Sequence, residues 1–251
     1  CAYHCQFCTC NNQKYMEIPI GQLDQAVQIA LKDTNNTPRH ILISGGTPRA
    51  EKGSYEYLNN VYHFFPNKYK EFEFDIMLSP RGMYSGEADE NGYIDFLKYL
   101  HDDCGIITMS INLELYNDTI RKEFIPDKWE IGKENYLLFI RNAVSIFGQG
   151  NIRSSLVVGL EKKDDTLKGV KELVNCGCIP VLSAFVPAPG TFMELYPKQE
   201  VDFLLDVVHE AALIAHSKGT VLGPLCRPCT HNSITEEIGN VHLKNYLCVE
   251  L

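Results

Sequence analysis

The sequence lacks an excess of positive charge and any long apolar run. It has 23 Lys and Arg against 32 Asp and Glu, a net charge of −9, and its basic residues are scattered rather than grouped. We therefore expect neither a nucleic acid nor an anionic membrane as a partner. No apolar stretch is long enough to span a bilayer, and no basic leader with an apolar centre is visible.

Linkers, low-complexity segments and short repeats are also lacking. Hydrophobic residues make up 45% of the 251 residues, which is enough for one large core. We therefore expect residues 1–251 to form a single domain. The ten cysteines are not needed as disulfide staples in a chain of this size, and their clustered spacing favours metal binding in a reducing compartment. We therefore expect a cytoplasmic protein.

Helix-like and strand-like stretches alternate along the chain. Repeated βα units imply right-handed crossovers and a parallel sheet covered by helices. Polar and glycine residues recur at the strand ends, where barrel enzymes build their sites, so we predict an α/β fold of the TIM-like (β/α) barrel type, full or partial. A first strand is expected upstream of Cys1. The expected strands are 40–48, 72–80, 105–115, 151–160, 179–187 and 220–226, with a further one possible in 240–251, and the expected helices are 20–33, 55–65, 93–103, 134–147, 164–177 and 200–219.

Four cysteines lie in the first ten residues, three of them spaced as Cys1-x-x-x-Cys5-x-x-Cys8. A structural zinc usually takes four ligands in two separated pairs. Three thiolates on one loop can instead hold three corners of a cubic [4Fe–4S] cluster and leave one iron open to a small molecule. Cys10 would add a fourth ligand only by straining the loop, so we interpret it as a bystander.

This spacing, with the aromatic Phe7 before the last cysteine, resembles the signature loop of the radical S-adenosylmethionine (SAM) enzymes. The resemblance implies that the open iron chelates the amino and carboxylate groups of SAM. An electron from the cluster then cleaves a carbon–sulfur bond and gives methionine and a 5′-deoxyadenosyl radical, which abstracts hydrogen from a substrate. It also implies an electron donor such as flavodoxin or ferredoxin.

The first visible strand ends in Ser44-Gly45-Gly46-Thr47-Pro48. This stretch resembles the two-glycine motif of the family, whose backbone receives the methionine amino group of SAM. Only glycine lets a backbone approach a ligand that closely. Taken alone, the stretch is an ordinary strand-to-loop turn. Its position one βα unit after the cysteines favours Gly45, Gly46 and Thr47 as cofactor-binding residues.

Strand alternation places Ser110, Asn112 and Glu114 on one face of the strand 105–115. The stretch is similar to one in the biotin synthase-like branch of the family. The resemblance implies that Asn112 and Glu114 hold the ribose hydroxyls of SAM, although Glu is one methylene longer than the Asp expected there. An internal polar network is the alternative interpretation, because inward polar groups need partners.

Two later strand ends extend the resemblance. Val157-Val158-Gly159-Leu160-Glu161 resembles the motif that packs against adenine; Val157 and Gly159 fit the pattern, and Glu161 departs from it. Residues 186–191 resemble the exit of the sixth strand in biotin synthase-like enzymes. The likeness runs from Cys1 to about residue 191 and therefore covers most of the chain.

Three residues are candidates for substrate chemistry. Arg153 is expected to face the barrel interior and to bind a substrate carboxylate or phosphate, or else to form a rim salt bridge. Cys226 and Cys229 form a Cys-x-x-Cys that could hold part of an auxiliary iron–sulfur cluster, touch substrate or act as a redox pair, but two cysteines alone do not complete a cluster. Cys104, Cys176 and Cys178 are interpreted as small buried hydrophobes.

The sequence thus predicts a radical SAM enzyme that acts on a small, anionic substrate. Sulfur insertion, rearrangement or lyase chemistry and metallocofactor maturation all stay open. The alternative is a non-catalytic barrel that binds zinc or an iron–sulfur cluster and serves as a scaffold or electron carrier. Such a protein would have no need for an inward pair like Asn112 and Glu114.

Overall fold

A computed structural model of the chain describes residues 1–13, 16–35, 38, 40–48, 52–224 and 233–234. One sheet holds five parallel strands in the order β1-β2-β3-β4-β5. The strands are β1 (His40–Ile43), β2 (Glu73–Met77), β3 (Thr108–Ser110), β4 (Ile152–Val158) and β5 (Ile179–Ala184). The predicted α/β fold of parallel βα units is confirmed, and within the described residues the sheet is open.

Helices alternate with the strands, as the hydrophobic periodicity predicted. They are α1 (Ile20–Ala30), α2 (Lys52–Lys68), α3 (Glu90–Lys98), α4 (Asp118–Phe124), α5 (Pro126–Ile131), α6 (Lys133–Phe147), α7 (Lys163–Asn175) and α8 (Val201–Ser217), with a 3₁₀ turn η1 (Thr9–Asn12) and a π-helical turn η2 (Tyr99–Asp103). The short helices α4 and α5 were not predicted, because two turns or fewer give no periodicity to read. Among the described residues, no helix is long and apolar enough to cross a membrane.

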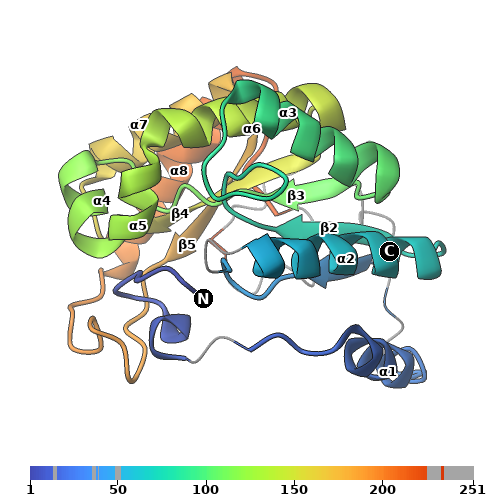
Figure 1. Cartoon of the computed structure of the whole chain (residues 1–251). Helices are drawn as coiled ribbons and strands as arrows, with labels where there is room; N and C mark the ends of the chain where they lie inside the picture. The colour runs from blue at the N-terminus through green and yellow to red at the C-terminus, as the bar shows by residue number, and fades with distance from the viewer. Residues whose placement is uncertain (14–15, 36–37, 39, 49–51, 225–232, 235–251) are drawn as a thin grey trace.

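The two faces of the sheet differ in chemistry. The pairs Met77–Ser110 and Ser110–Arg153 stand side by side across β2, β3 and β4, so these side chains share one face, called here the inner face. The other face is apolar and lies under α3, α6, α7 and α8 (Figure 1). Each large side chain buried there stabilises the fold by about 2 kcal/mol. The fully buried strand residues on that face include Phe74, Ile76, Met109, Ile152, Leu156, Val158 and Leu182.

Of the last two predicted strands, only residues 220–224 lie in the described part of the chain. In the predicted strand 220–226, Gly223 forms only an isolated bridge with Val181, and residues 225–226 lie outside the described part, as do 240–251. At the other edge, an apolar cleft separates β1 from α1. The strand expected before Cys1 and the single domain expected over residues 1–251 stay predictions.

Candidate functional site

The cysteine loop, residues 1–8, lies against the end of β1. The Thr47 N–H donates to the Cys1 sulfur at 3.3 Å, and the Ala2 N–H donates to the Thr47 carbonyl at 2.8 Å. Gly46 has a φ of +79°, and a Cβ built on it would lie 2.7 Å from the Cβ of Cys1. Residue 46 therefore admits the loop because it has no side chain. The structure brings together the cysteines and the two-glycine stretch that the sequence singled out.

The short helices α4 and α5 anchor the middle of the cysteine loop. The Gln6 N–H donates to the Phe124 carbonyl at 2.8 Å. The His4 N–H donates to the Asp127 carboxylate at 2.6 Å, and the His4 ring nitrogen Nδ1 lies 3.2 Å from the same oxygen. Figure 1 shows the N-terminal segment beside these helices and beside the segment that follows β5. The loop is thus fixed by three separate parts of the chain.

A small apolar cluster joins the cysteine loop to the end of β4. Cys5 and Val157 are buried in it, and Phe7 packs against it. Burial raises the pKa of the Cys5 thiol to about 12. Because the thiolate is the form that binds metal, metal binding at Cys5 would release this proton. The buried members of the cluster are Cys5, Leu115, Phe124, Ile125, Val157, Leu160, Phe185 and Met193.

The thiols of the loop have the chemistry of iron–sulfur cluster ligands. Among the described residues, no three His, Cys, Asp or Glu side chains converge closely enough to hold one metal ion. A cube binds each thiolate at a separate iron atom, so its ligands need not meet at one point. Cys5 is buried, Cys1 and Cys8 are half-buried, and none of the three forms a disulfide. Three free thiols on one anchored loop are a suitable donor set for three corners.

Asn112 and Glu114 follow β3, which ends at Ser110 rather than at residue 115 as predicted, and Glu114 forms an isolated bridge with Leu156 of β4. Asn112 Oδ1 accepts from the Ser110 hydroxyl at 2.8 Å and from the Ser155 N–H at 3.2 Å. The Glu114 N–H donates to the Ser155 carbonyl at 2.9 Å, and the Val157 N–H donates to the Glu114 carbonyl at 2.7 Å. Three of the predicted SAM-binding residues, Asn112, Glu114 and Val157, are therefore neighbours.

Glu114 has an unusual backbone. Its φ of +66° lies in the left-handed region, and no other non-glycine residue in the described part has a positive φ. A conformation of this kind costs about 1–2 kcal/mol and persists only where the surroundings hold it, often at functional sites.

Two buried cations that sequence reasoning missed support this strand end. Lys128 Nζ donates to Glu114 Oε1 at 2.8 Å and to the Asn112 carbonyl at 3.0 Å. Arg121, whose side chain is fully buried, donates to the two carbonyl groups that flank Glu114, at 3.0 and 2.8 Å. The sequence could not single out Lys128 or Arg121, because a basic residue that follows an acidic one is too common a pattern.

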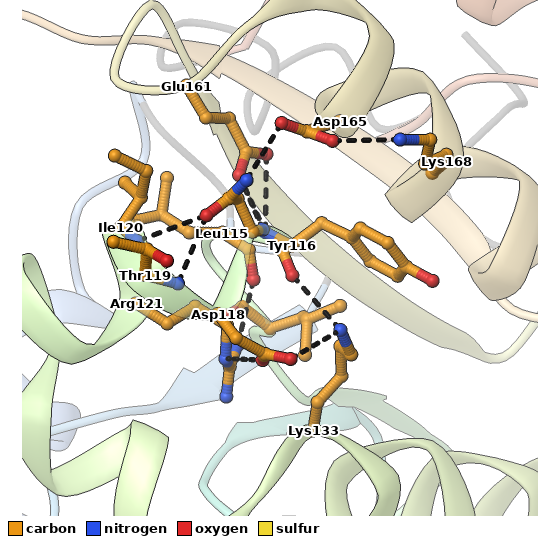
Figure 2. A network of polar contacts seen from close by, with 12 residues as sticks. Leu115, Tyr116, Asp118, Thr119, Ile120, Arg121, Lys133, Glu161, Asp165 and Lys168 are labelled. Carbon is orange, nitrogen blue, oxygen red and sulfur yellow. Dashed lines mark hydrogen bonds and ion pairs between the residues drawn. The ribbon is translucent and has the colours of Figure 1, made fainter.

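Glu161 holds the segment after β3 to the start of α7 (Figure 2). Its buried carboxylate accepts from the N–H groups of Tyr116 at 2.9 Å and Asn117 at 2.8 Å, and from the Thr166 hydroxyl at 3.2 Å. Burial raises the pKa of Glu161, and these hydrogen bonds offset part of the rise. Glu161, which departs from the adenine motif, therefore uses its carboxylate to bind other residues of this chain.

Replacing Glu161 by alanine is expected to lower the free energy of unfolding by about 3 kcal/mol, because buried donors lose a charged acceptor. Urea unfolding followed by circular dichroism measures the change. Asp118→Ala is the control, since Asp118 lies in the same network but its side chain is 63% exposed; we expect a change below about 1 kcal/mol. Equal effects of the two substitutions would contradict the role assigned to Glu161.

Gly159 makes room for the segment after β5. It has a φ of +110°, and a Cβ there would lie 2.8 Å from Cγ of Gln199. The Gln199 amide donates to the Gly159 carbonyl at 3.1 Å. The contact of Val157 and Gly159 with adenine stays a prediction.

Arg153 is already paired. On the inner face, its guanidinium forms an ion pair with Asp75 of β2. The Asp75 side chain is 4% exposed, and its second oxygen, Oδ1, is buried and accepts no hydrogen bond from the described residues. The salt-bridge alternative is thus realised, within the sheet rather than at its rim. Binding of a substrate anion by Arg153 stays a prediction.

Five further cysteines divide into two groups. Cys104, Cys176 and Cys178 are buried, as expected for small apolar side chains. Cys226 and Cys229 lie outside the described residues, so their catalytic role and the auxiliary cluster stay predictions.

No protein-family model matches the chain. Over 110 residues the chain is 29% identical to bacteriochlorophyllide c C-7(1)-hydroxylase of Chlorobaculum limnaeum, which covers 43% of this chain and 27% of that protein. Among solved structures, Streptococcus suis SuiB bound to S-adenosylmethionine has a TM-score of 0.66 at 12% identity, covering 90% of this chain and 48% of that one. A radical SAM methyltransferase from Sphaerobacter thermophilus has a TM-score of 0.62 at 15% identity, covering 89% of this chain and 62% of that one.

The chain therefore spans less than two thirds of the length of each of these relatives. The structural likeness extends over nearly all of this chain and agrees with the sequence resemblance based on the cysteine loop. The chain has the fold of the radical SAM enzymes.

Proposed function

We propose that this chain is the catalytic domain of a radical SAM enzyme, with Cys1, Cys5 and Cys8 as ligands of a [4Fe–4S] cluster. The observation that supports the proposal most is the contact of Cys1 with Gly46 and Thr47. It joins the cysteine loop to a strand end with two glycines, where a backbone without side chains can approach a ligand. A scaffold protein that only held a metal would not need this arrangement.

The residues around the cysteine loop would form the binding site for SAM. The cluster and SAM together supply, when bound, the electron transfer and the 5′-deoxyadenosyl radical that abstracts hydrogen from a substrate. Gly45 and Gly46 would receive the methionine end through their backbone, and Thr47, whose own N–H and carbonyl pair with the cysteine loop, would border it. Asn112 and Glu114 would bind the ribose hydroxyls, while Phe7, Val157 and Gly159 would border the adenine. The apolar cluster around Cys5 would keep water away from the reacting atoms.

The substrate would lie on the inner face of the sheet, where Arg153 and Asp75 form the ion pair. An anionic group on a small substrate would compete with Asp75 for Arg153. The relatives include a methyltransferase and a hydroxylase, so they do not single out one reaction. Sulfur insertion, rearrangement or lyase chemistry and metallocofactor maturation are the candidates, and flavodoxin or ferredoxin would supply the electron.

Anaerobic reconstitution with iron and sulfide tests the proposal. The wild type is expected to bind about four iron atoms per chain and, with SAM and dithionite, to release methionine and 5′-deoxyadenosine. Asn112→Ala is expected to weaken SAM binding by about tenfold, because it removes a hydrogen-bonding group from the ribose site, and to leave the iron content unchanged. A reconstituted protein that never cleaves SAM would refute the enzyme and leave the metal scaffold.

A further inference from the structure

One ammonium group fixes both residues of the predicted ribose site. Lys128 Nζ donates to Glu114 Oε1 at 2.8 Å and to the Asn112 carbonyl at 3.0 Å. Lys128 lies in α5, and its own carbonyl accepts from Arg121 Nη2 at 3.0 Å. A single side chain thus ties the backbone of Asn112 and the side chain of Glu114 to the helical segment that also anchors the cysteine loop.

The Glu114 carboxylate is held at one oxygen only. Oε1 takes the ammonium, whereas no hydrogen bond to Oε2 occurs among the described residues. The Glu114 side chain is 15% exposed and the Lys128 side chain 9%, so the pair is largely shielded from water. An oxygen that is fixed in direction, yet without a partner, is suited to accept hydrogen bonds from a ligand.

Because the Glu114 backbone is left-handed, its side chain needs the contact with Lys128 to keep its direction. A positive φ turns the side chain away from the regular alternation of the strand, so neither the ladder with β4 nor the strand direction determines where the carboxylate points. Burial alone would lower the pKa of Lys128, but the Glu114 carboxylate outweighs it and the pKa is raised. The ammonium is therefore charged where it donates to Glu114 Oε1.

Stability alone does not account for a pair of this kind. Replacing a buried ion pair by apolar residues of similar volume is often neutral or stabilising. A buried pair is therefore more informative about geometry than about stability, above all where it holds a strained residue.

We propose that Lys128 is a positioning residue, which directs Glu114 Oε2 toward the ribose hydroxyls of SAM. The inference rests on the proposed function, because it concerns the SAM site itself. Lys128 does not touch the reacting atoms. It acts through Glu114. Because Glu is one methylene longer than the usual aspartate, its carboxylate needs a contact that holds it in one direction.

The first test is Lys128→Met, which keeps the length of the side chain and removes its charge. Isothermal titration calorimetry of the reconstituted protein with SAM is expected to show a Kd raised by about tenfold or more, since a charge-assisted contact is lost. The iron content per chain is expected to stay at the wild-type value. Lys128→Arg keeps a donor and is expected to retain most of the SAM affinity.

Lys133→Met is the matched control. Lys133 begins α6 and donates to the Tyr116 carbonyl at 3.3 Å and to the Asp118 carboxylate at 3.2 Å, but it contacts neither Asn112 nor Glu114. Its replacement is expected to leave the Kd for SAM unchanged. A Kd that rises equally in both variants would mean that any lost lysine in this region disturbs SAM binding, and would overturn the proposal.

The swapped variant Glu114→Lys/Lys128→Glu separates positioning from stability and keeps a buried pair if Lys128→Met fails to fold. It is expected to unfold near the wild-type urea midpoint and still bind SAM at least tenfold more weakly, because no carboxylate projects from position 114. SAM affinity restored by the swap, or unchanged in folded Lys128→Met, overturns the inference alone. A wild type that holds its cluster and binds no SAM overturns the proposed function as well.

Discussion

Replacing Gly46 by alanine is expected to remove most of the iron from the reconstituted protein. The new Cβ would lie 2.7 Å from the Cβ of Cys1 and 3.2 Å from its Cα. The φ of +79° at residue 46 adds strain for any residue with a side chain. Cys1 would have to move away from Thr47, and the first cluster ligand would move with it. Iron and sulfide counts per chain measure the loss.

Gly45→Ala provides a matched control in the neighbouring residue. A Cβ built on Gly45 meets no atom within 4 Å, so the cysteine loop keeps its place. We expect the wild-type iron content in this variant and a loss confined to SAM affinity, since the backbone of Gly45 is proposed to face the methionine group. Full iron content in Gly46→Ala would contradict the idea that residue 46 determines where Cys1 lies.

Local motifs explain why part of the site could be predicted from the sequence. The spacing of Cys1, Cys5 and Cys8 depends only on neighbouring residues, and a parallel fold brings the ends of successive strands to one edge. The contact of Cys1 with Thr47 follows from these two facts. The alternation of Ser110 and Asn112 follows from the period of a strand, and the hydrogen bond between their side chains agrees with it.

The supporting residues could not be predicted, because they depend on tertiary contacts. Lys128 and Arg121 belong to helices of six and seven residues, too short for a periodic signal. The positive φ of Glu114 is imposed by its surroundings, and no sequence pattern indicates it. Arg153 and Asp75 are 78 positions apart, and only the register of β2, β3 and β4 brings them to one face.

Arg153→Leu is expected to lower the free energy of unfolding by about 3–5 kcal/mol, because it leaves Asp75 as an unpaired charge inside the fold. The effect should be larger than for most surface substitutions, since the Asp75 side chain is only 4% exposed and one of its oxygens already lacks a hydrogen-bond donor among the described residues. Urea unfolding of the apoprotein, compared with the wild type under the same conditions, measures the difference.

The double variant Asp75→Leu/Arg153→Leu distinguishes a functional pair from a structural one. Two leucines of suitable size replace both charges, so its stability is expected to return to the wild-type value or to exceed it. A pair retained for stability would instead leave the double variant as unstable as Arg153→Leu. Because neither residue is among those that hold the cysteine loop, the double variant is also expected to bind iron and to cleave SAM without a substrate. Stability and SAM cleavage that both survive would point to the substrate as the reason why the chain keeps two opposite charges inside its sheet.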